Sequence, residues 1–314
     1  MVFEGYTFQF SWEIALMEWL QANIPESVIS VISVFSAFGE ELVMIAIMGF
    51  IYWCYNKELG RKVGVTICVG LCAAPMIKNI FFRRRPYFDN PSIKCLRPVD
   101  SGSDLYNIST QGYSFPSGHS TNAAVMYPAL AFHSKELRKV FSILAPILCF
   151  LVGFSRVVVG CHYPTDVLCG WALGLVVMFG VSLILGRILD KRIRFLVLAI
   201  ICGIGMFYCK TSDYFASYGL LIGFLLSEPF EEKFVKFEAT NNPLEIILRV
   251  ILGGAIYLVL NTLLKMPFSK EFLDSGSYAA NLLRFVRYGI VIFFLTAIYP
   301  MIFKYSPFRK KEGK

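Results

Sequence analysis

The sequence predicts an all-α integral membrane protein, and three observations support that prediction. The chain of 314 residues is 56% hydrophobic and only 17% charged, with a mean hydropathy of +0.59. Apolar runs of about 17 to 25 residues recur along it, and each is long enough to cross a bilayer as a helix. Short polar breaks separate the runs. Helices are expected because lipid offers backbone N–H and C=O groups no hydrogen-bond partner.

The order of the runs predicts a helical bundle with about nine transmembrane helices. Residues 11–37 are expected to form two short interfacial amphipathic helices broken at Pro25. The predicted spans then cover residues 40–56, 61–82, 118–133, 138–157, 163–186, 194–210, 214–229, 244–265 and 282–304. We divide the chain into an N-terminal segment, a six-helix core and a C-terminal extension with about three extra spans, over residues 1–39, 40–193 and 194–314.

Basic residues between the spans predict the orientation of the chain in the membrane. With nine spans, the basic stretches share one side, which we assign to the cytoplasm together with the C-terminus: residues 57–62, 135–139, 187–194, 233–236 and 309–311. The loops at 83–117, 155–162 and 266–281 then lie on the extracytoplasmic side. Lys78 and Arg83-Arg84-Arg85 form a basic cluster on the side where the charge rule predicts few cations. Binding of an anion would account for that cluster.

Charge and cysteine content exclude several other interpretations. The net charge of +8 does not indicate nucleic-acid binding, because Lys and Arg occur in short clusters between apolar runs. The first residues lack the basic start and cleavage site of a secretory signal and are expected to remain in the mature chain. Most cysteines are expected to be small packing residues in apolar runs: Cys54, Cys68, Cys72, Cys149, Cys169, Cys202 and Cys209. Cys95 and Cys161, on the predicted outer side, are the one pair considered for a disulfide.

The segment from Ser155 to Asp166 constrains the chemistry most. His162 and Asp166 are four residues apart, and Pro164 sits where a helix can begin, because a missing N–H is tolerated in a first turn. We expect the Asp166 carboxylate to accept one ring N–H of His162 and to leave the other nitrogen free to attack phosphorus. Arg156 can offer a planar guanidinium to phosphate oxygens.

A second polar segment, Pro116-Ser117-Gly118-His119, precedes an apolar run, so Ser117 is a predicted helix N-cap. Gly118 lets a ligand approach the backbone closely, and free N–H groups at a helix start favour an anion. His119 is the candidate general acid that protonates the leaving alkoxide. The third histidine, His133, lies in a predicted cytoplasmic stretch and is interpreted as structural or solvated.

The first polar segment ends a predicted span. Lys78 and Arg85 are seven residues apart, or two helical turns, so we expect both to face one site, with Pro86 ending the helix. Arg83 and Arg84 are interpreted as anchors that snorkel to the membrane boundary.

Together the three segments resemble a family signature. The pattern Lys78-x6-Arg85-Pro86, Pro116-Ser117-Gly118-His119 and Ser155-Arg156-x5-His162-x3-Asp166 is similar to the three-part motif of the type 2 phosphatidic acid phosphatase superfamily, over roughly residues 40–186. The superfamily includes lipid phosphate phosphatases, undecaprenyl pyrophosphate phosphatases and glucose-6-phosphatase. The resemblance implies that the six-helix core is a phosphatase core, without metal or cofactor. It also implies a phosphohistidine at His162, support from Asp166, protonation of the leaving group by His119, and phosphoryl oxygens held by Lys78, Arg85, Ser117, Gly118 and Arg156.

The predicted function is therefore hydrolysis of a lipid phosphate or pyrophosphate on the extracytoplasmic face, through a phosphohistidine. An active site at the bilayer edge lets an acyl or prenyl chain stay among the membrane lipids while only the headgroup enters. The alternatives are a phosphatase for a soluble sugar phosphate, a lipid phosphotransferase, and a non-catalytic lipid-phosphate binder or transporter. A haloperoxidase is not expected, because that branch of the superfamily is soluble. The sequence leaves the oligomeric state open.

Overall fold

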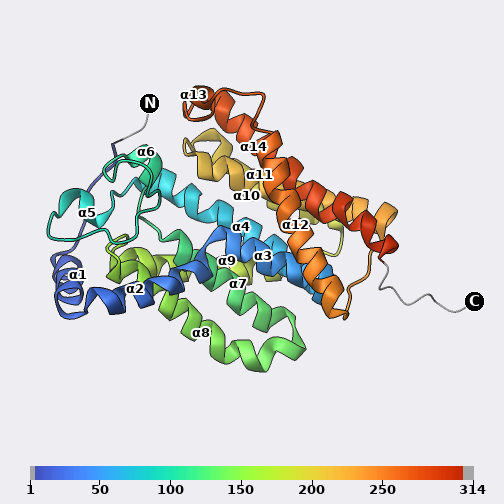
Figure 1. The fold of residues 1–314 in the computed structure, drawn as a ribbon, viewed down its shortest axis with the longest axis horizontal. Helices are drawn as coiled ribbons and strands as arrows, with labels where there is room; N and C mark the ends of the chain where they lie inside the picture. Colours follow the sequence, from blue (N-terminus) through green and yellow to red (C-terminus); the bar gives the residue numbers. More distant parts are fainter. Residues whose placement is uncertain (1–3, 307–314) are drawn as a thin grey trace, which may run out of the picture. The chain divides into compact units, whose positions relative to one another are not determined.

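The computed structural model describes residues 4–306, and these are almost entirely helical (Figure 1). The predicted basic stretch at residues 309–311 lies outside them. Each of the nine predicted spans coincides with helical structure. Within the described residues, five helices are long and apolar enough to cross a membrane: α4 (Lys57–Phe81), α8 (Lys135–Val158), α9 (Pro164–Arg187), α12 (Pro243–Leu263) and the continuous helical stretch Tyr278–Tyr305. The all-helical membrane fold is confirmed, and the count of nine spans stays a prediction.

The chain divides into two compact units. The first contains the residues up to Met44 together with Gly70–Leu183, and the second contains Ile45–Val69 together with the residues from Ile184 onwards. All the predicted site residues belong to the first unit.

The first unit begins with two short helical pieces, α1 (Ser11–Asn23) and α2 (Glu26–Val34), and a 3₁₀ turn, η1 (Phe35–Gly39). The chain bends by 112° between α1 and the α2–η1 stretch, so the predicted break at Pro25 is confirmed. The long loop after α4 contains only two short helices, α5 (Pro86–Asp89) and α6 (Ile108–Gln111).

Three helices form the frame of the first unit: α7 (Gly118–His133), α8 and α9. Helix α7 packs along α8, and η1 contacts both. Helix α9 approaches α7 closely at Gly174, where an added Cβ would lie 2.6 Å from the Cβ of Ala124. Small residues permit such close backbone approach between membrane helices. The frame brings the first turns of α7 and α9 and the last turn of α8 together.

The second unit contains most of α3 (Glu41–Phe50), then η2 (Ile51–Tyr55), α10 (Lys191–Gly203), η3 (Ile204–Phe207), α11 (Ser212–Phe230), η4 (Glu231–Val235), α12, α13 (Lys270–Leu273), α14 (Tyr278–Phe293), η5 (Phe294–Ile298) and η6 (Tyr299–Tyr305). Helices α11 and α14 pack along each other. Ion pairs join Lys57 to Glu231 at 3.0 Å and Lys191 to Glu228 at 3.1 Å. Three polar segments that were predicted to share one side of the membrane therefore meet at one end of this unit.

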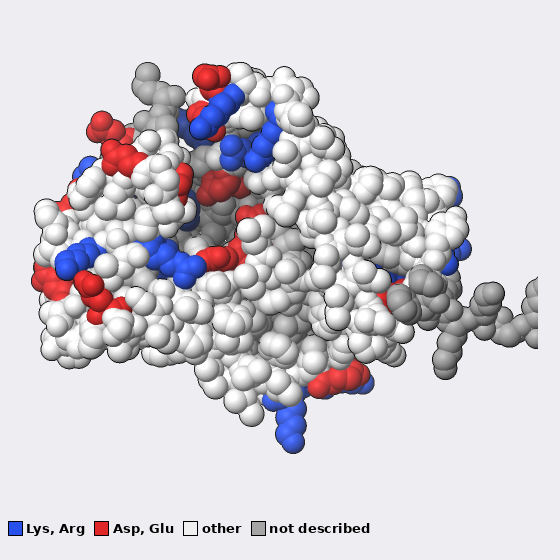
Figure 2. Space-filling model, in the orientation of Figure 1, with Lys and Arg blue, Asp and Glu red and all other residues white. Residues whose placement is uncertain are grey.

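Most of the visible surface carries no charged residue (Figure 2). In this view, charged side chains lie over α1, α5 and α6, and further groups lie over α13 and at the lower end of α8. Large apolar side chains such as Val176 and Phe179 on α9 are exposed. Such an apolar exterior is expected for helices that face lipid.

Candidate active site

The turn between α8 and α9 presents His162. Gly160 adopts a positive φ of 78°, and an added Cβ there would collide with the carbonyl oxygen of Lys94. The N–H of His162 then donates to the carbonyl of Arg156 at 3.2 Å. Helix α9 begins at Pro164, as predicted. The turn is closed by its own backbone, so His162 is held before the helix starts.

Asp166 lies beside His162, as its spacing predicts. Its Oδ2 is 3.4 Å from Nδ1 of His162 and accepts a hydrogen bond of 2.8 Å from the N–H of Tyr163. Both side chains are buried, with 2% and 0% exposure. Nδ1 has no hydrogen-bond partner among the described residues, so the nearby Oδ2 is the acceptor that its proton faces.

Arg85 occupies the other side of the imidazole. Its Nη1 is 3.2 Å from Nε2 of His162 and donates to the carbonyl of Cys161 at 3.0 Å. Its Nε donates to the carbonyls of Gln111 and Gly112 at 2.8 and 3.1 Å. A guanidinium has no acceptor, so Nε2 must carry the lone pair and Nδ1 the proton. This tautomer leaves the lone pair of Nε2 on the side of Arg85.

The predicted helical relation between Lys78 and Arg85 is wrong. Helix α4 ends at Phe81, and Phe82 takes a positive φ of 49°. Lys78 lies in the last turn of α4, whereas Arg85 lies in extended backbone and precedes α5. Pro86 begins α5 instead of ending α4 because a proline in a first turn forfeits no hydrogen bond.

Ser117 links the second segment to the third. It is the N-cap of α7, as predicted, and its Oγ accepts from the N–H of Ser120 at 3.3 Å. Its own N–H donates to the carbonyl of Asp166 at 3.0 Å. An added Cβ at Gly118 would meet no atom within 4 Å, so the space beside it is open. His119 follows in the first turn of α7, where N–H groups lack helical acceptors.

Arg156 reaches the site from the last turn of α8 and is only 2% exposed. Its Nη1 donates to Oγ of Ser36 at 3.1 Å, and that hydroxyl lies 2.8 Å from Oγ of Ser155. Its Nε has no hydrogen-bond partner among the described residues. Sequence reasoning missed Ser36, because nothing in the pattern of η1 distinguishes it from a packing residue.

The electrostatic environment of His162 shows which cations converge on it. Burial lowers its pKa well below the ordinary value, and nearby charges lower it further, in the order Arg85, Arg156, Lys78 and His119. The imidazole is therefore neutral at neutral pH and can act as a nucleophile. All three sequence segments contribute to this environment.

Arg83 contradicts its interpretation as a snorkelling anchor. It is fully buried and forms ion pairs with Asp166 at 2.7 Å and Glu13 at 2.8 Å. Arg84 is partly exposed and pairs with Asp89 at 2.7 Å. Sequence reasoning also missed Glu13, whose only signal is its spacing: it lies four residues before Met17 and seven before Leu20, the other two buried residues of α1.

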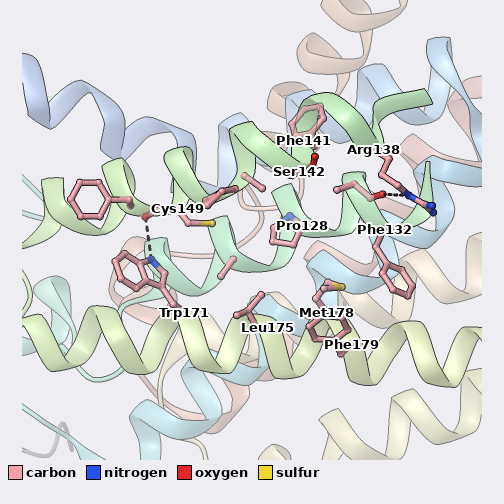
Figure 3. Close-up of a pocket in the computed structure, with 15 residues that line it drawn as sticks. Pro128, Phe132, Arg138, Phe141, Ser142, Cys149, Trp171, Leu175, Met178 and Phe179 are labelled. Atoms are coloured by element: carbon pink, nitrogen blue, oxygen red, sulfur yellow. Dashed lines mark hydrogen bonds between the residues drawn. The ribbon is translucent and has the colours of Figure 1, made fainter. Parts of the chain in front are cut away.

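An apolar cavity of about 780 Å³ lies between α7, α8 and α9 (Figure 3). Trp171 and Cys149 line it, and the indole N–H of Trp171 donates to the carbonyl of Cys149 at 3.1 Å. At the other end of the view, Arg138 donates to the carbonyl of Ala131. Trp171 lies five residues beyond Asp166 in α9, which corresponds to about 7.5 Å along the helix. The near end of the cavity therefore lies between one and two helical turns from Asp166, and its lining on α9 continues away from the site to Phe179.

The Sγ atoms of Cys95 and Cys161 lie 3.7 Å apart. Cys161 also donates from Sγ to the carbonyl of Arg97 at 2.9 Å. The two cysteines predicted as a candidate pair are thus neighbours, directly beside the turn that carries His162.

Comparison with known proteins identifies two regions of the sequence. Residues 59–190 match the PAP2 superfamily, and residues 215–311 match the PAP2 superfamily phosphatase, transmembrane extension. The Phosphatidylglycerophosphatase B of Bacillus subtilis (strain 168) is 45% identical over 80 residues, which are 23% of this chain and 39% of that protein. The Undecaprenyl-diphosphatase of Sulfolobus acidocaldarius is 28% identical over 149 residues, 46% of this chain and 64% of that protein. The alignments thus span less than two thirds of either relative.

A crystal structure of a transmembrane PAP2 type phosphatidylglycerolphosphate phosphatase from Bacillus subtilis is also similar. It shares 26% sequence identity, with a TM-score of 0.45, over 57% of this chain and 86% of that one.

Proposed function

Because this chain carries a PAP2 superfamily domain followed by the transmembrane extension of PAP2 superfamily phosphatases, we propose that it is a membrane-embedded phosphatase. Its substrate is a lipid phosphate or a lipid pyrophosphate. One observation carries the proposal: a buried, neutral imidazole directs Nε2 at Arg85 on one side and Nδ1 at Asp166 on the other. This arrangement is suited to nucleophilic attack on a phosphoryl group.

The reaction has two steps. Nε2 of His162 attacks phosphorus, an N–P bond forms, and the bond from phosphorus to the leaving oxygen breaks. His119 donates a proton to that oxygen. Water then attacks the phosphohistidine and returns a proton to His119, the N–P bond breaks to restore the lone pair of Nε2, and inorganic phosphate leaves.

Cationic side chains hold the phosphoryl oxygens through both steps. In the free enzyme, Arg85 donates toward Nε2 of His162, so the substrate must take over that donor as it binds. Arg156 has an unused Nε, and Lys78 adds a third charge. The N–H groups at the start of α7, next to the open space at Gly118, add neutral donors. Such fixed donors stabilise charge that develops in the transition state, and we propose that the reaction requires no metal.

The cavity and the relatives favour a lipid substrate over a sugar phosphate. The cavity offers an apolar surface within about two helical turns of His162, where an acyl or prenyl chain can lie while the headgroup reaches the cations. The names of the two curated relatives refer to phosphatidylglycerophosphate and to undecaprenyl diphosphate, both of which carry long apolar chains. A soluble sugar phosphate would leave the cavity without a role.

We place the active site on the extracytoplasmic face and the C-terminus in the cytoplasm. The basic segments around Lys57 and Lys191 meet at one end of the second unit, where they pair with Glu231 and Glu228. The positive-inside rule assigns that end to the cytoplasm. One predicted span, residues 61–82, separates Lys57 from the loop at 83–117, and one, residues 163–186, separates Lys191 from the turn at 155–162. Both site loops therefore lie on the opposite side of the membrane from these lysines.

The test is hydrolysis of a substrate panel by the purified protein in detergent. The panel contains phosphatidylglycerol phosphate, undecaprenyl pyrophosphate, phosphatidate and glucose 6-phosphate. We expect release of phosphate from at least one lipid, undiminished by EDTA, and its loss in His162→Ala but not in the matched variant His133→Ala. Activity retained in His162→Ala would contradict the mechanism, and preference for glucose 6-phosphate would contradict the substrate class.

A further inference from the structure

Arg83 is the centre of a buried network that reaches the active site through Asp166. Its Nη1 donates to Oδ1 of Asp166 at 2.7 Å and to the hydroxyl of Thr165 at 2.8 Å. Its Nη2 donates to Oε2 of Glu13 at 2.8 Å, and its Nε donates to the carbonyl of Phe8 at 2.7 Å. The guanidinium also lies 3.9 Å from the ring centre of Tyr163. All three guanidinium nitrogens are engaged, through four of the five N–H donors, so the contacts of Arg83 are to the protein itself.

Glu13 is fully buried at the start of α1 and is also saturated with hydrogen bonds. Oε1 accepts from the hydroxyl of Thr165 at 2.5 Å and from its N–H at 3.1 Å. Oε2 accepts from Arg83 and from the N–H of Phe10 at 3.0 Å. Thr165 lies in the first turn of α9, one residue before Asp166. Glu13 thus holds both Arg83 and the helix turn that carries Asp166.

The network fixes the orientation of the Asp166 carboxylate. Oδ1 is bound by Arg83, while Oδ2 is bound by the N–H of Tyr163 and faces Nδ1 of His162. Rotation of the carboxylate would break the bond to Arg83. The bond thereby keeps Oδ2, which lies 3.4 Å from Nδ1 of His162, beside the imidazole.

The charges of the network also matter. Glu13 and Asp166 are negative and Arg83 is positive, so the three side chains together carry one net negative charge. The imidazole of His162 becomes cationic when it accepts a phosphoryl group. A buried net negative charge beside it favours that state.

We propose that Glu13 and Arg83 are positioning residues of the active site, which orient Asp166 toward the nucleophile and couple helix α1 to it. The proposal rests on the proposed function of His162 as the nucleophile. Glu13 lies in the N-terminal segment, outside the residues that match the PAP2 superfamily. The N-terminal helix, which the sequence assigned to the membrane interface, thereby becomes part of the catalytic apparatus.

The first test compares Glu13→Gln with Glu18→Gln, an exposed position on the same helix. Glutamine preserves the size of the side chain and removes its charge. We expect Glu13→Gln to lower kcat by about 10- to 100-fold with little change in KM, because misplacement by about 1 Å can cost about 100-fold. Glu13→Asp should restore part of the rate, and Glu18→Gln should match the wild type. A kcat for Glu13→Gln equal to that of Glu18→Gln overturns the proposal.

The second test needs no turnover. Hydrogen–deuterium exchange at the imidazole C2 position, followed by mass spectrometry across pH, reports the pKa of His162. Loss of a negative charge in Glu13→Gln should lower that pKa, whereas loss of a positive charge in Arg83→Gln should raise it. The other groups that act on His162 stay in place in both variants: Arg85, Arg156, Lys78, His119 and Asp166.

Opposite shifts distinguish the network from a merely structural role, which would move both variants in the same direction or neither. Arg84→Gln is the matched control for Arg83→Gln, because Arg84 pairs at the surface with Asp89. If Arg83→Gln does not fold, the comparison of Glu13→Gln with Glu18→Gln, in kcat and in the pKa of His162, still tests the proposal. An unshifted pKa of His162 in Glu13→Gln overturns the proposal that Glu13 acts on the active site. An absence of lipid phosphatase activity in the wild type, with the pKa shifts present, refutes the proposed function instead.

Discussion

Two buried arginines of the second unit, Arg61 and Arg249, and two of the first unit, Arg85 and Arg156, have different kinds of partner. In the second unit, Arg61 forms ion pairs with Glu231 and Glu232, and Arg249 forms one with Glu245 at 2.6 Å. In the first unit, Arg85 and Arg156 bond to carbonyls, to a hydroxyl and to an imidazole. Neither forms an ion pair within the described part of the chain.

The difference separates structural cations from cations available for binding. In a buried ion pair, the attraction between the two charges offsets much of their desolvation cost, so the pair is part of the folded structure. A buried guanidinium that has only neutral partners keeps its charge uncompensated, and an anionic ligand can supply the missing charge. Arg83 shows that both kinds occur side by side, because it is paired like Arg61 although it lies two residues from Arg85.

Replacing a cation of the site gives the largest expected effect. Arg85→Gln should lower kcat/KM by about 100- to 1,000-fold, the usual cost of removing one donor to a transition-state oxyanion. The free energy of unfolding should change less than in Arg61→Gln, because Arg85 leaves no charged partner behind. Phosphate release and chemical denaturation measure the two quantities. A stable Arg85→Gln variant with wild-type turnover would contradict a role for Arg85 in the active site.

The corresponding change in the second unit should affect stability instead. Arg61→Gln leaves Glu231 buried with Lys57 as its remaining cation, and removing one partner of a buried pair costs about 3 to 5 kcal/mol. Activity per folded molecule should equal that of the wild type. Denaturation with urea in detergent gives the loss, and a variant that is stable but inactive would break the comparison.

The cavity of the first unit offers a smaller effect on substrate binding. Cys149→Trp places a bulky side chain in the cavity, whereas Cys169→Trp makes the same change at an exposed position of α9 outside it. We expect Cys149→Trp to raise KM about 10-fold for a long-chain lipid phosphate, roughly the loss of one or two buried methylene groups. A short-chain soluble analogue should be unaffected. Equal KM values in the two variants would argue against a lipid chain in this cavity.

The lowered pKa of His162 predicts how activity depends on pH. Because burial and neighbouring cations lower this pKa, the imidazole loses its proton at a lower pH than a free histidine, whose pKa is about 6.5. The acidic limb of kcat/KM should therefore lie below pH 6.5, after correction for the titration of the substrate phosphate near pH 6. A limb above pH 6.5 that belongs to the free enzyme would contradict the charge environment described for His162.

The smallest effect concerns the two thiols beside the site. With glutathione disulfide as oxidant, Cys95 and Cys161 should form a disulfide, since their Sγ atoms are only 3.7 Å apart. The protein loses two hydrogens and the oxidant becomes two glutathione molecules. Mass spectrometry of nonreduced peptides detects the bond, and Cys95→Ser abolishes it. Two free thiols after treatment would exclude the pair.

The sequence predicted helices better than the relations between helices. Apolar runs mark α8 and α9 closely, because lipid makes helix the only way to satisfy the backbone. The predicted two-turn relation of Lys78 and Arg85 was wrong because α4 ends at Phe81, and the termination depends on the positive φ of Phe82. Helix ends are decided by such local conformations, which hydrophobic patterns do not report.

The predicted relations between site residues are present in the structure where the two residues lie close together in the sequence. His162 and Asp166 were expected to be neighbours, and Ser117 was expected to cap α7; both relations are present. Residues outside the three segments were missed. Ser36 and Glu13 reach the site across more than a hundred residues of sequence, and their residue types alone carry no sign of that contact.

The sequence by itself determined that this protein is a helical membrane protein and which side chains are the candidates for phosphoryl transfer, because composition and short spacing are local properties. Only the tertiary structure decided the separate roles of three consecutive arginines. Arg83 is enclosed by Glu13 and Asp166, Arg84 pairs at the surface with Asp89, and Arg85 faces His162. The physical reason is that a guanidinium takes its role from the charges packed around it, and those charges come from distant parts of the chain.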